Sequence, residues 1–290
     1  MKEPRYMTVS AKLLAHHDDM TPSERQLLKA LMDDYPIAGL SSITELASKA
    51  GVSTTTVARL LQKTGFDGFP QFQAALRGEL KEMISDPIAK RDIWKNDFPD
   101  EHILNRYSRQ ALENQKSSLE EINPDDFDKL CQLLSDPSRT IYITGGRITG
   151  TLAHYLYLHL QMIRPHVRLI SSGGSWPHDL LDIGPNDVMV AFDVRRYENS
   201  TLQMAQMCHE KGAALVLFTD LWRSPIHRIA THIFSGNIVV PSAWDSGLPL
   251  LMFIECTIAA VQEIMWDTVK NRTDALETAF DQTKLFRKFT

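Results

Sequence analysis

Hydrophobic positions follow two different spacings along the chain, and the change between them divides it into two parts. In residues 21–81, apolar side chains such as Leu27, Leu28 and Leu31 lie on one face of a helical repeat, which predicts amphipathic helices. From residue 140 onward, short apolar runs rich in β-branched residues alternate with helical patterns. This alternation is typical of a mostly parallel, doubly wound sheet. The pattern therefore predicts an all-helical N-terminal domain followed by an α/β domain.

The predicted strands of the second part are short, and helices are expected before, between and after them. The strands are residues 140–144, 167–170, 187–192, 214–219 and 232–234. The helices are residues 100–121, 123–134, 149–163, 198–211, 224–230 and 247–270. Because ligands of such sheets bind at the carboxyl ends of the strands, the loops that follow the strands are the places where a binding site is expected.

Residues 42–63 predict two short helices joined by a tight turn. Gly51 stands where the first helix must end, and glycine adopts the left-handed backbone of such a turn at little steric cost. Ser53 is a good N-cap for the second helix. A simple helical hairpin has the same outline, but small polar residues at the start of the second helix favour a helix-turn-helix, whose second helix enters the DNA major groove. The candidate DNA contacts are Ser53, Thr54, Thr55, Thr56, Arg59 and Lys63.

The segments around this helix pair complete a helical domain. Thr21-Pro-Ser-Glu combines a capping-box pattern with proline at the first helical position, and it opens a helix over residues 21–34. Three phenylalanines in residues 66–72 are expected to pack on the bundle, and turn signals in residues 85–105 indicate a connection. We therefore divide the chain into a helix-turn-helix domain, a linker with a connecting helix, and an α/β domain: residues 1–84, 85–122 and 123–290.

The composition is that of an ordinary globular protein and changes the picture little. Of 290 residues, 43% are hydrophobic and 23% charged, and the net charge of −5 argues against indiscriminate binding of polyanions by the whole molecule. Cations only slightly outnumber carboxylates in the candidate DNA-binding region. Specific binding is therefore expected to need a dimer that presents two sites.

The motifs that the sequence lacks narrow the range of possible functions further. The three cysteines are isolated and have no metal-ligand spacing, which fits buried thiols in a reducing cytoplasm. We see no signal peptide and no uncharged run of membrane-spanning length, so a cytoplasmic protein without a membrane partner is expected. Neither a phosphate-binding Walker loop, a zinc motif nor a serine-nucleophile elbow occurs. We therefore expect no catalytic residues, no metal and no cofactor.

The order of these motifs resembles the RpiR-type bacterial transcription regulators, which join an N-terminal helix-turn-helix domain to a C-terminal sugar isomerase (SIS) domain. The N-terminal resemblance is carried by Thr21-Pro-Ser-Glu, Ile43-Thr-Glu-Leu-Ala, Ala50-Gly-Val-Ser, Val57-Ala-Arg and Gly65-Phe-Asp-Gly-Phe-Pro. The C-terminal resemblance is carried by Ile141-Tyr-Ile-Thr-Gly, Asp187-Val-Met-Val-Ala-Phe, Lys211-Gly-Ala-Ala-Leu-Val-Leu-Phe-Thr-Asp and Ser224-Pro-Ile. The resemblance implies a homodimer or homotetramer that binds an operator in double-stranded DNA. Its SIS domain would sense a phosphorylated sugar or related anionic metabolite and alter operator binding.

Two loops of the chain depart from the pattern that the resemblance implies for a sugar-phosphate site. Where the family has Gly-x-Gly-x-Ser after the first strand, this chain has arginine in place of the second glycine. Where the family has Ser-x-Ser-Gly-x-Thr after the third strand, two arginines and carboxylates replace most of the hydroxyls. The candidate ligand contacts in these loops and before the last helix are Gly145, Gly146, Arg147, Thr149, Asp193, Arg195, Arg196, Tyr197 and Ser246.

Several of these candidates have a structural alternative. Arginine suits paired hydrogen bonds to phosphate or carboxylate, but Arg195 or Arg196 also has Asp193 and Glu198 nearby, or a neighbouring subunit, as ion-pair partners. The pair Asp245-Ser246 closes the site or caps the last helix. Residues 171–175 form a hydroxyl-rich loop, and Trp176 and His178 after it are further candidates for lining a pocket.

Two other functions remain open at the sequence level. The first is a sugar-phosphate isomerase-like enzyme with an accessory helical domain, but Glu255 and the histidines of the helical segments show no convergent arrangement. The second is an SIS fold kept only for oligomerisation.

Overall fold

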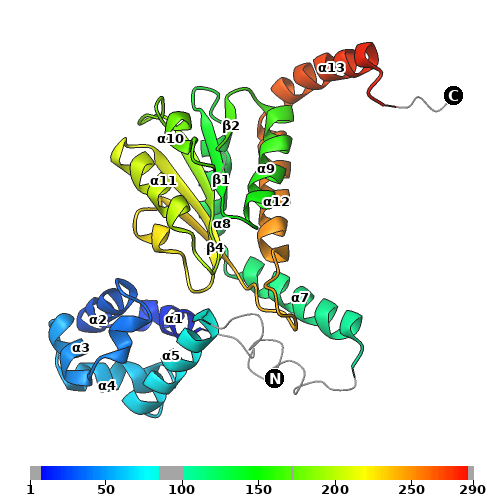
Figure 1. The fold of residues 1–290 in the computed structure, drawn as a ribbon. Coiled ribbons are helices and arrows are strands. Elements are labelled where there is room, and N and C mark those ends of the chain that lie inside the picture. Colours follow the sequence, from blue (N-terminus) through cyan, green and yellow to red (C-terminus); the bar gives the residue numbers. More distant parts are fainter. Residues whose placement is uncertain (1–7, 85–100, 171–172, 287–290) are drawn as a thin grey trace. The chain divides into compact units, whose positions relative to one another are not determined.

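The computed structural model describes residues 8–84, 101–170 and 173–286, and the chain forms two compact units, Met1–Lys90 and Arg91–Thr290 (Figure 1). The turn signals expected within residues 85–100 lie outside the described residues. Each unit has its own buried hydrophobic core.

Unit 1 is all-helical. Its α-helices are α1 Val9–Leu14, α2 Pro22–Met32, α3 Ile43–Lys49, α4 Thr54–Lys63 and α5 Phe69–Ile84, with 3-10 turns η1 His17–Asp19 and η2 Ile37–Leu40. Capping boxes start both α2, at Thr21 and Glu24, and α3, at Ser42 and Glu45. These reciprocal hydrogen bonds satisfy amides that the helix itself leaves unpaired, so the two starts agree with the sequence. The short α1, η1 and η2 carry too few residues for a periodic pattern, and the sequence did not reveal them.

The core of unit 1 is built from the apolar faces of all five helices. Leu27, Leu46 and Leu60 are completely buried within it. Phe72 is also buried and meets Phe66 edge-on, with ring centroids 5.6 Å apart, and Phe69 at 5.8 Å. The phenylalanines of residues 66–72 therefore pack on the bundle as expected.

Unit 2 is an α/β domain with a parallel sheet. Its strands are β1 Ile141–Gly145, β2 Val167–Leu169, β3 Val188–Phe192, β4 Ala214–Asp220 and β5 His232–Gly236. Its helices are α7 Ile103–Glu120, α8 Pro124–Ser135, α9 Gly150–Ile163, α10 Trp176–Asp179, α11 Asn199–Glu210, η3 Pro225–Arg228, α12 Leu248–Ile264 and α13 Trp266–Thr283. The sheet order is β2-β1-β3-β4-β5, and every neighbouring pair is parallel. The expected doubly wound fold is confirmed.

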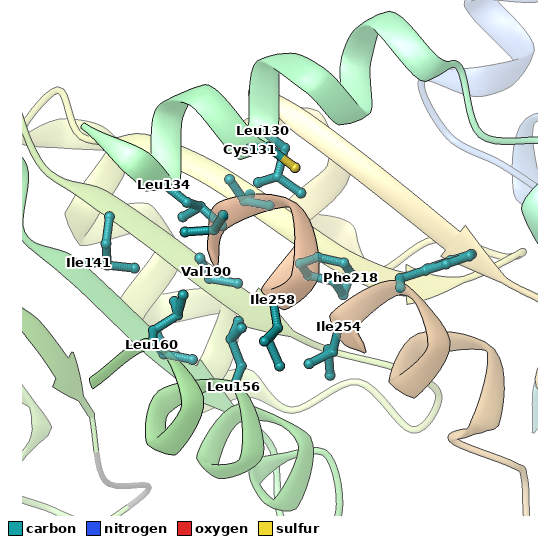
Figure 2. Packing of buried hydrophobic residues seen from close by; sticks show 14 of the residues in the cluster. Leu130, Cys131, Leu134, Ile141, Leu156, Leu160, Val190, Phe218, Ile254 and Ile258 are labelled. Atoms are coloured by element: carbon teal, nitrogen blue, oxygen red, sulfur yellow. The ribbon is translucent and has the colours of Figure 1, made fainter. Parts of the chain in front are cut away.

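Successive residues of the strands enter opposite hydrophobic layers, because side chains alternate along a strand. On β1, Ile141 and Ile143 join the layer formed with α8, α9 and α12, whereas Tyr142 joins the layer formed with α11. Figure 2 shows the first layer, where Leu156 of α9 and Ile258 of α12 pack against the strands. Helices on both faces leave the carboxyl ends of the strands as the place where loops gather.

The chain after the sheet differs from the single helix expected over 247–270. It forms α12 and α13, which meet at Met265 with an angle of 97°. The break lets Met265 and Val269 both pack in the layer that contains Val261, and it brings α13 against α9. Within the described part of the chain, no single helix is long and apolar enough to cross a membrane, although this bent pair passes that test by length and composition.

Two smaller elements also refine the expectations. The helical pattern at 224–230 is only the 3-10 turn η3, which Ser224 caps by accepting a hydrogen bond from the Ile226 amide. The connecting helix α7 packs on α12 and β5, and Asn114 donates to the Val239 carbonyl over 2.6 Å. Helix α7 is therefore fixed to unit 2.

Candidate functional site

Helices α3 and α4 are joined by a compact turn with the expected glycine. Gly51 has φ of +63°, and the Val52 amide donates to the Ala47 carbonyl over 2.9 Å, which ends α3. Ser53 then caps α4 by accepting the Thr56 amide over 3.1 Å. The left-handed residue and the cap together fix the angle at which α4 leaves the turn.

The two faces of α4 differ sharply in exposure. Val57, Leu60 and Leu61 are buried in the unit 1 core. Thr54, Thr55 and Arg59 lie on the exposed face. The packing of the domain therefore leaves these three side chains in contact with solvent, as a helix that enters a DNA groove requires.

The other DNA-contact candidates have contacts inside unit 1. The Ser53 hydroxyl caps the helix and hydrogen-bonds to the Thr56 hydroxyl over 3.0 Å. Lys63 lies 3.3 Å from a carboxylate oxygen of Glu24 and also donates to the Asp19 carbonyl. Burial raises the pKa of Glu24, but hydrogen bonds from Thr21 and Lys63 lower it by more, so the carboxyl is held below its usual range. These contacts give Lys63 a structural role that the sequence did not reveal.

In unit 2, hydrogen bonds to the hydroxyl of Thr149 fix the conformation of the loop after β1. The Thr149 hydroxyl accepts the Gly146 amide over 2.8 Å and donates to the Phe192 carbonyl over 2.7 Å, joining the ends of β1 and β3. Both glycines are closely packed. A Cβ on Gly145 would lie 2.7 Å from backbone atoms of Thr149, and a Cβ on Gly146 would lie 2.7 Å from the Glu198 carboxylate.

Glu198, a residue outside the candidate set, contacts this loop directly. Its side chain accepts the Arg147 amide, although the two residues are 51 positions apart. Its own amide donates to Asp193 over 3.2 Å, and the residue stands at the N-cap of α11. The carboxylate therefore bridges the loops after β1 and β3.

Two buried carboxylates organise the ends of β3 and β4. Asp220 is completely buried and accepts the Tyr197 hydroxyl and the Arg195 amide, each over 2.7 Å. Asp193 accepts the Ser224 hydroxyl. Burial raises the pKa of Asp193 to about 6 and raises the pKa of Asp220 and of the Tyr197 phenol. Asp193 and Tyr197, both candidates for ligand contact, are thus parts of an internal network.

Arg195 is held in a paired hydrogen bond with Asp245. Its Nε and Nη2 atoms lie 3.0 and 2.8 Å from the two carboxylate oxygens, and its side chain is only 5% exposed. The guanidinium also stacks on the ring of Trp222 at 4.0 Å. Of the alternatives left by the sequence, the structure has an ion pair here, and the carboxylate in it is Asp245. Contact of Arg195 with a ligand remains a prediction.

The remaining candidates differ in exposure. Arg147 and Arg196 are exposed at the ends of β1 and β3. Ser246 is buried, and its hydroxyl accepts the Leu248 amide over 3.3 Å at the start of α12. Trp176 packs on the α11 layer and His178 is exposed, but residues 171–172 before them lie outside the described part. The structure thus brings together the loops after β1 and β3, with two exposed arginines.

Searching the described residues, we find no group of three or more histidine, cysteine or carboxylate side chains that is able to hold a metal ion. The side chain of Glu255 accepts the Tyr155 hydroxyl, and the Tyr155 ring lies 4.6 Å from that of His159. These groups lie on α9 and α12.

Comparison with known proteins identifies both units. Residues 7–83 match the helix-turn-helix domain of the rpiR family, and residues 133–260 match the SIS domain. The chain is 21% identical over 271 residues to an HTH-type transcriptional regulator of Providencia stuartii, covering 90% of this chain and 89% of the relative. It is also 21% identical to the HTH-type transcriptional regulator GlvR of Bacillus subtilis, over 75% of this chain and 78% of the relative.

Solved structures agree on the fold. The sugar isomerase domain of an RpiR transcription factor from Sphaerobacter thermophilus is similar with a TM-score of 0.58 and 18% identity, over 61% of this chain and 99% of that one. The Vibrio vulnificus NanR protein, solved with ManNAc-6P, has a TM-score of 0.56 and 15% identity, over 96% of this chain and 99% of that one. With both domain models matched in this order, the chain belongs to the RpiR-type transcriptional regulators, with an N-terminal helix-turn-helix domain and a C-terminal SIS domain.

Proposed function

We propose that this regulator binds a double-stranded DNA operator through α4, and that a small anionic metabolite bound at the strand-end loops changes its affinity for the operator. The observation that carries the proposal is the exposed face of α4. Its apolar residues fill the core, whereas Thr54, Thr55 and Arg59 face solvent at the start of the second helix of the motif. Hydroxyls and a guanidinium there suit phosphate oxygens and base edges.

The sensing part of the proposal rests on the strand-end loops of unit 2. Arg147 and Arg196 are exposed there and suit an anionic group. NanR, which has the same fold, was solved with a sugar phosphate, and this supports a sugar phosphate or related anion as the effector class. Binding would shift the population between arrangements with different operator affinity.

The proposal includes a homodimer or homotetramer. It acts in the cytoplasm, where it has access to the operator DNA. Two helix-turn-helix units placed about one DNA turn apart would compensate for the few cations of each unit. It also makes the SIS domain a sensor and not an enzyme, in agreement with relatives that are named as regulators.

The experiment is recovery of bound fragments from sheared genomic DNA, followed by gel-shift titration of the recovered operator. Replacing Arg59 by alanine should weaken operator binding about 5- to 100-fold, because a base or phosphate contact is lost. Arg25→Ala, which removes an exposed arginine of α2, is the matched control. Equal operator affinity of the two variants and the wild type would contradict the assignment of α4. A panel of sugar phosphates added to the same titration tests the effector class.

A further inference from the structure

The anion-binding position of the strand-end loops is already filled by a side chain of the protein itself. Amides in a glycine-containing loop between a strand and the start of a helix form a general anion site, because they point outward and lie at the positive end of the helix dipole. The loop between β1 and α9 has this form. The Arg147 amide donates there to the carboxylate of Glu198.

Packing against Gly146 shows that the carboxylate lies directly on the loop. A Cβ at Gly146 would lie 2.7 Å from Glu198 Oε1 and 2.9 Å from its Cδ, closer than real Cβ contacts. Glycine at this position thus makes the space that the carboxylate occupies. The neighbouring Gly146 amide is satisfied by the Thr149 hydroxyl over 2.8 Å. Both loop amides therefore have acceptors within the chain.

The other charged groups of the site are consistent with a carboxylate of the protein occupying the anion position. Arg195 is neutralised by Asp245, so its guanidinium is not open to an anion while that pair holds. Asp193 accepts the Glu198 amide and places a second carboxyl at the start of α11. A phosphate that entered here would meet the negative charge of Glu198 at the position of its own oxygens.

Resting on the proposed function, we propose that Glu198 is the specificity-determining residue of the effector site. Its carboxylate competes with any anionic group for the amide of the loop after β1. An oxyanion-bearing effector binds only by displacing Glu198, so the wild-type site discriminates against small free anions such as inorganic phosphate. Displacement also breaks the hydrogen bond between the Glu198 side chain and the Arg147 amide, which joins the loop after β1 to the start of α11, so the effector has a structural consequence beyond occupancy.

The test measures binding of inorganic phosphate to the full chain by calorimetry and thermal shift, with ionic strength held constant by exchange against chloride. Glu198→Gln removes the charge and keeps an acceptor for the Arg147 amide. Glu198→Ser removes the side chain from the loop and leaves a favoured N-cap residue on α11, so the helix is preserved. Glu210→Gln is the matched control, since this exposed residue at the other end of α11 changes the net charge equally.

We expect phosphate affinity to rise at least about fivefold in Glu198→Ser, the effect that one unit charge exerts on another at 4 Å even in bulk water. A rise in Glu198→Gln as well shows that charge is the main obstacle, whereas a rise in Glu198→Ser alone shows that occupancy is. No rise in either variant, or an equal rise in Glu210→Gln, would overturn the proposal. Phosphate binding is measured without DNA, so its result is independent of whether α4 binds the operator.

Discussion

Arg195 and Asp245 form a two-point ion pair that joins the loop after β3 to the loop before α12, 50 positions later in the chain. The pair lies against Trp222, and the Arg195 side chain is 5% exposed. A guanidinium in this setting is costly to leave without its carboxylate.

Removing either partner should therefore destabilise unit 2, and removing the second partner afterwards should cost less than removing it from the wild type. We expect Asp245→Ala to lower the free energy of unfolding by about 2–3 kcal/mol, because Arg195 remains buried without its main partner. In the double variant Arg195→Ala with Asp245→Ala, the loss should fall short of the sum of the single losses by at least about 1 kcal/mol. Urea unfolding of the four proteins measures this cycle, and strictly additive losses would show that the pair contributes nothing.

The two adjacent glycines after β1 should respond differently to alanine. In Gly145→Ala the new methyl meets backbone atoms of Thr149 and Gly150 at 2.7–2.8 Å, which only a backbone shift relieves. In Gly146→Ala it meets the Glu198 side chain, which can rotate away. We expect a loss of about 1–3 kcal/mol in unfolding free energy for Gly145→Ala and a clearly smaller loss for Gly146→Ala. Thermal melting of both variants checks the order, and the reverse order would contradict the described loop packing.

The buried carboxyl of Asp193 should make stability depend on pH. Burial raises its pKa to about 6, above the value near 3.9 of an unfolded chain, so the folded state binds the proton more tightly. Its contribution to stability is therefore present at low pH and is lost as pH rises from about 4 to about 6. Asp193→Asn removes this titration. Between pH 5 and pH 7, we expect the stability of the wild type to fall relative to the variant, by about 1–2 kcal/mol.

Urea unfolding at the two pH values measures this difference, since other titrating groups are common to both proteins. Asp187→Asn, just before the start of β3, is a control for loss of a carboxylate next to the same strand. An identical pH dependence in the wild type and Asp193→Asn would show that Asp193 keeps an ordinary pKa when folded.

The sequence predicted the elements well because their signals are local. Thr21, Ser42 and Ser53 cap the helices that they were expected to start, and the alternating strands form the expected parallel sheet. The end of α12 was missed because no glycine or proline marks it. The chain bends at Met265 to bury Val269 in the sheet layer, and this depends on tertiary packing.

The site was less predictable because its contacts are distant in sequence. Arg195 had carboxylates close to it in sequence, yet its partner is Asp245. Glu198 was considered only as an ion-pair partner, whereas its carboxylate accepts an amide 51 positions away. Lys63 had the position of a DNA contact on α4, but the buried Glu24 lies beside it. In each case the residue type indicated the kind of interaction, but the partner could be identified only from the fold.

Substitutions of Arg59 and Lys63 should therefore distinguish a side chain that contacts DNA from one that stabilises the domain. Lys63 pairs with Glu24, whose side chain is only 2% exposed, so Lys63→Ala should lower the stability of unit 1 by about 1 kcal/mol. Arg59→Ala should leave thermal stability almost unchanged, because Arg59 lies on the exposed face of α4. Lys49→Ala, which breaks an exposed pair with Asp34, is a control for loss of a surface lysine.

Salt dependence of operator binding completes the comparison, because each neutralised phosphate contributes about 0.9 to the slope of log affinity against log salt. If Arg59 binds a phosphate, its loss should reduce the slope by about 1 per domain. If it reads a base, the slope stays but discrimination among operator variants falls. For Lys63→Ala we expect the wild-type slope at temperatures where unit 1 is folded, since its ammonium is engaged by Glu24 and the Asp19 carbonyl. If Lys63→Ala reduced the salt slope and left the melting temperature of unit 1 unchanged, Lys63 would have to leave Glu24 to bind DNA.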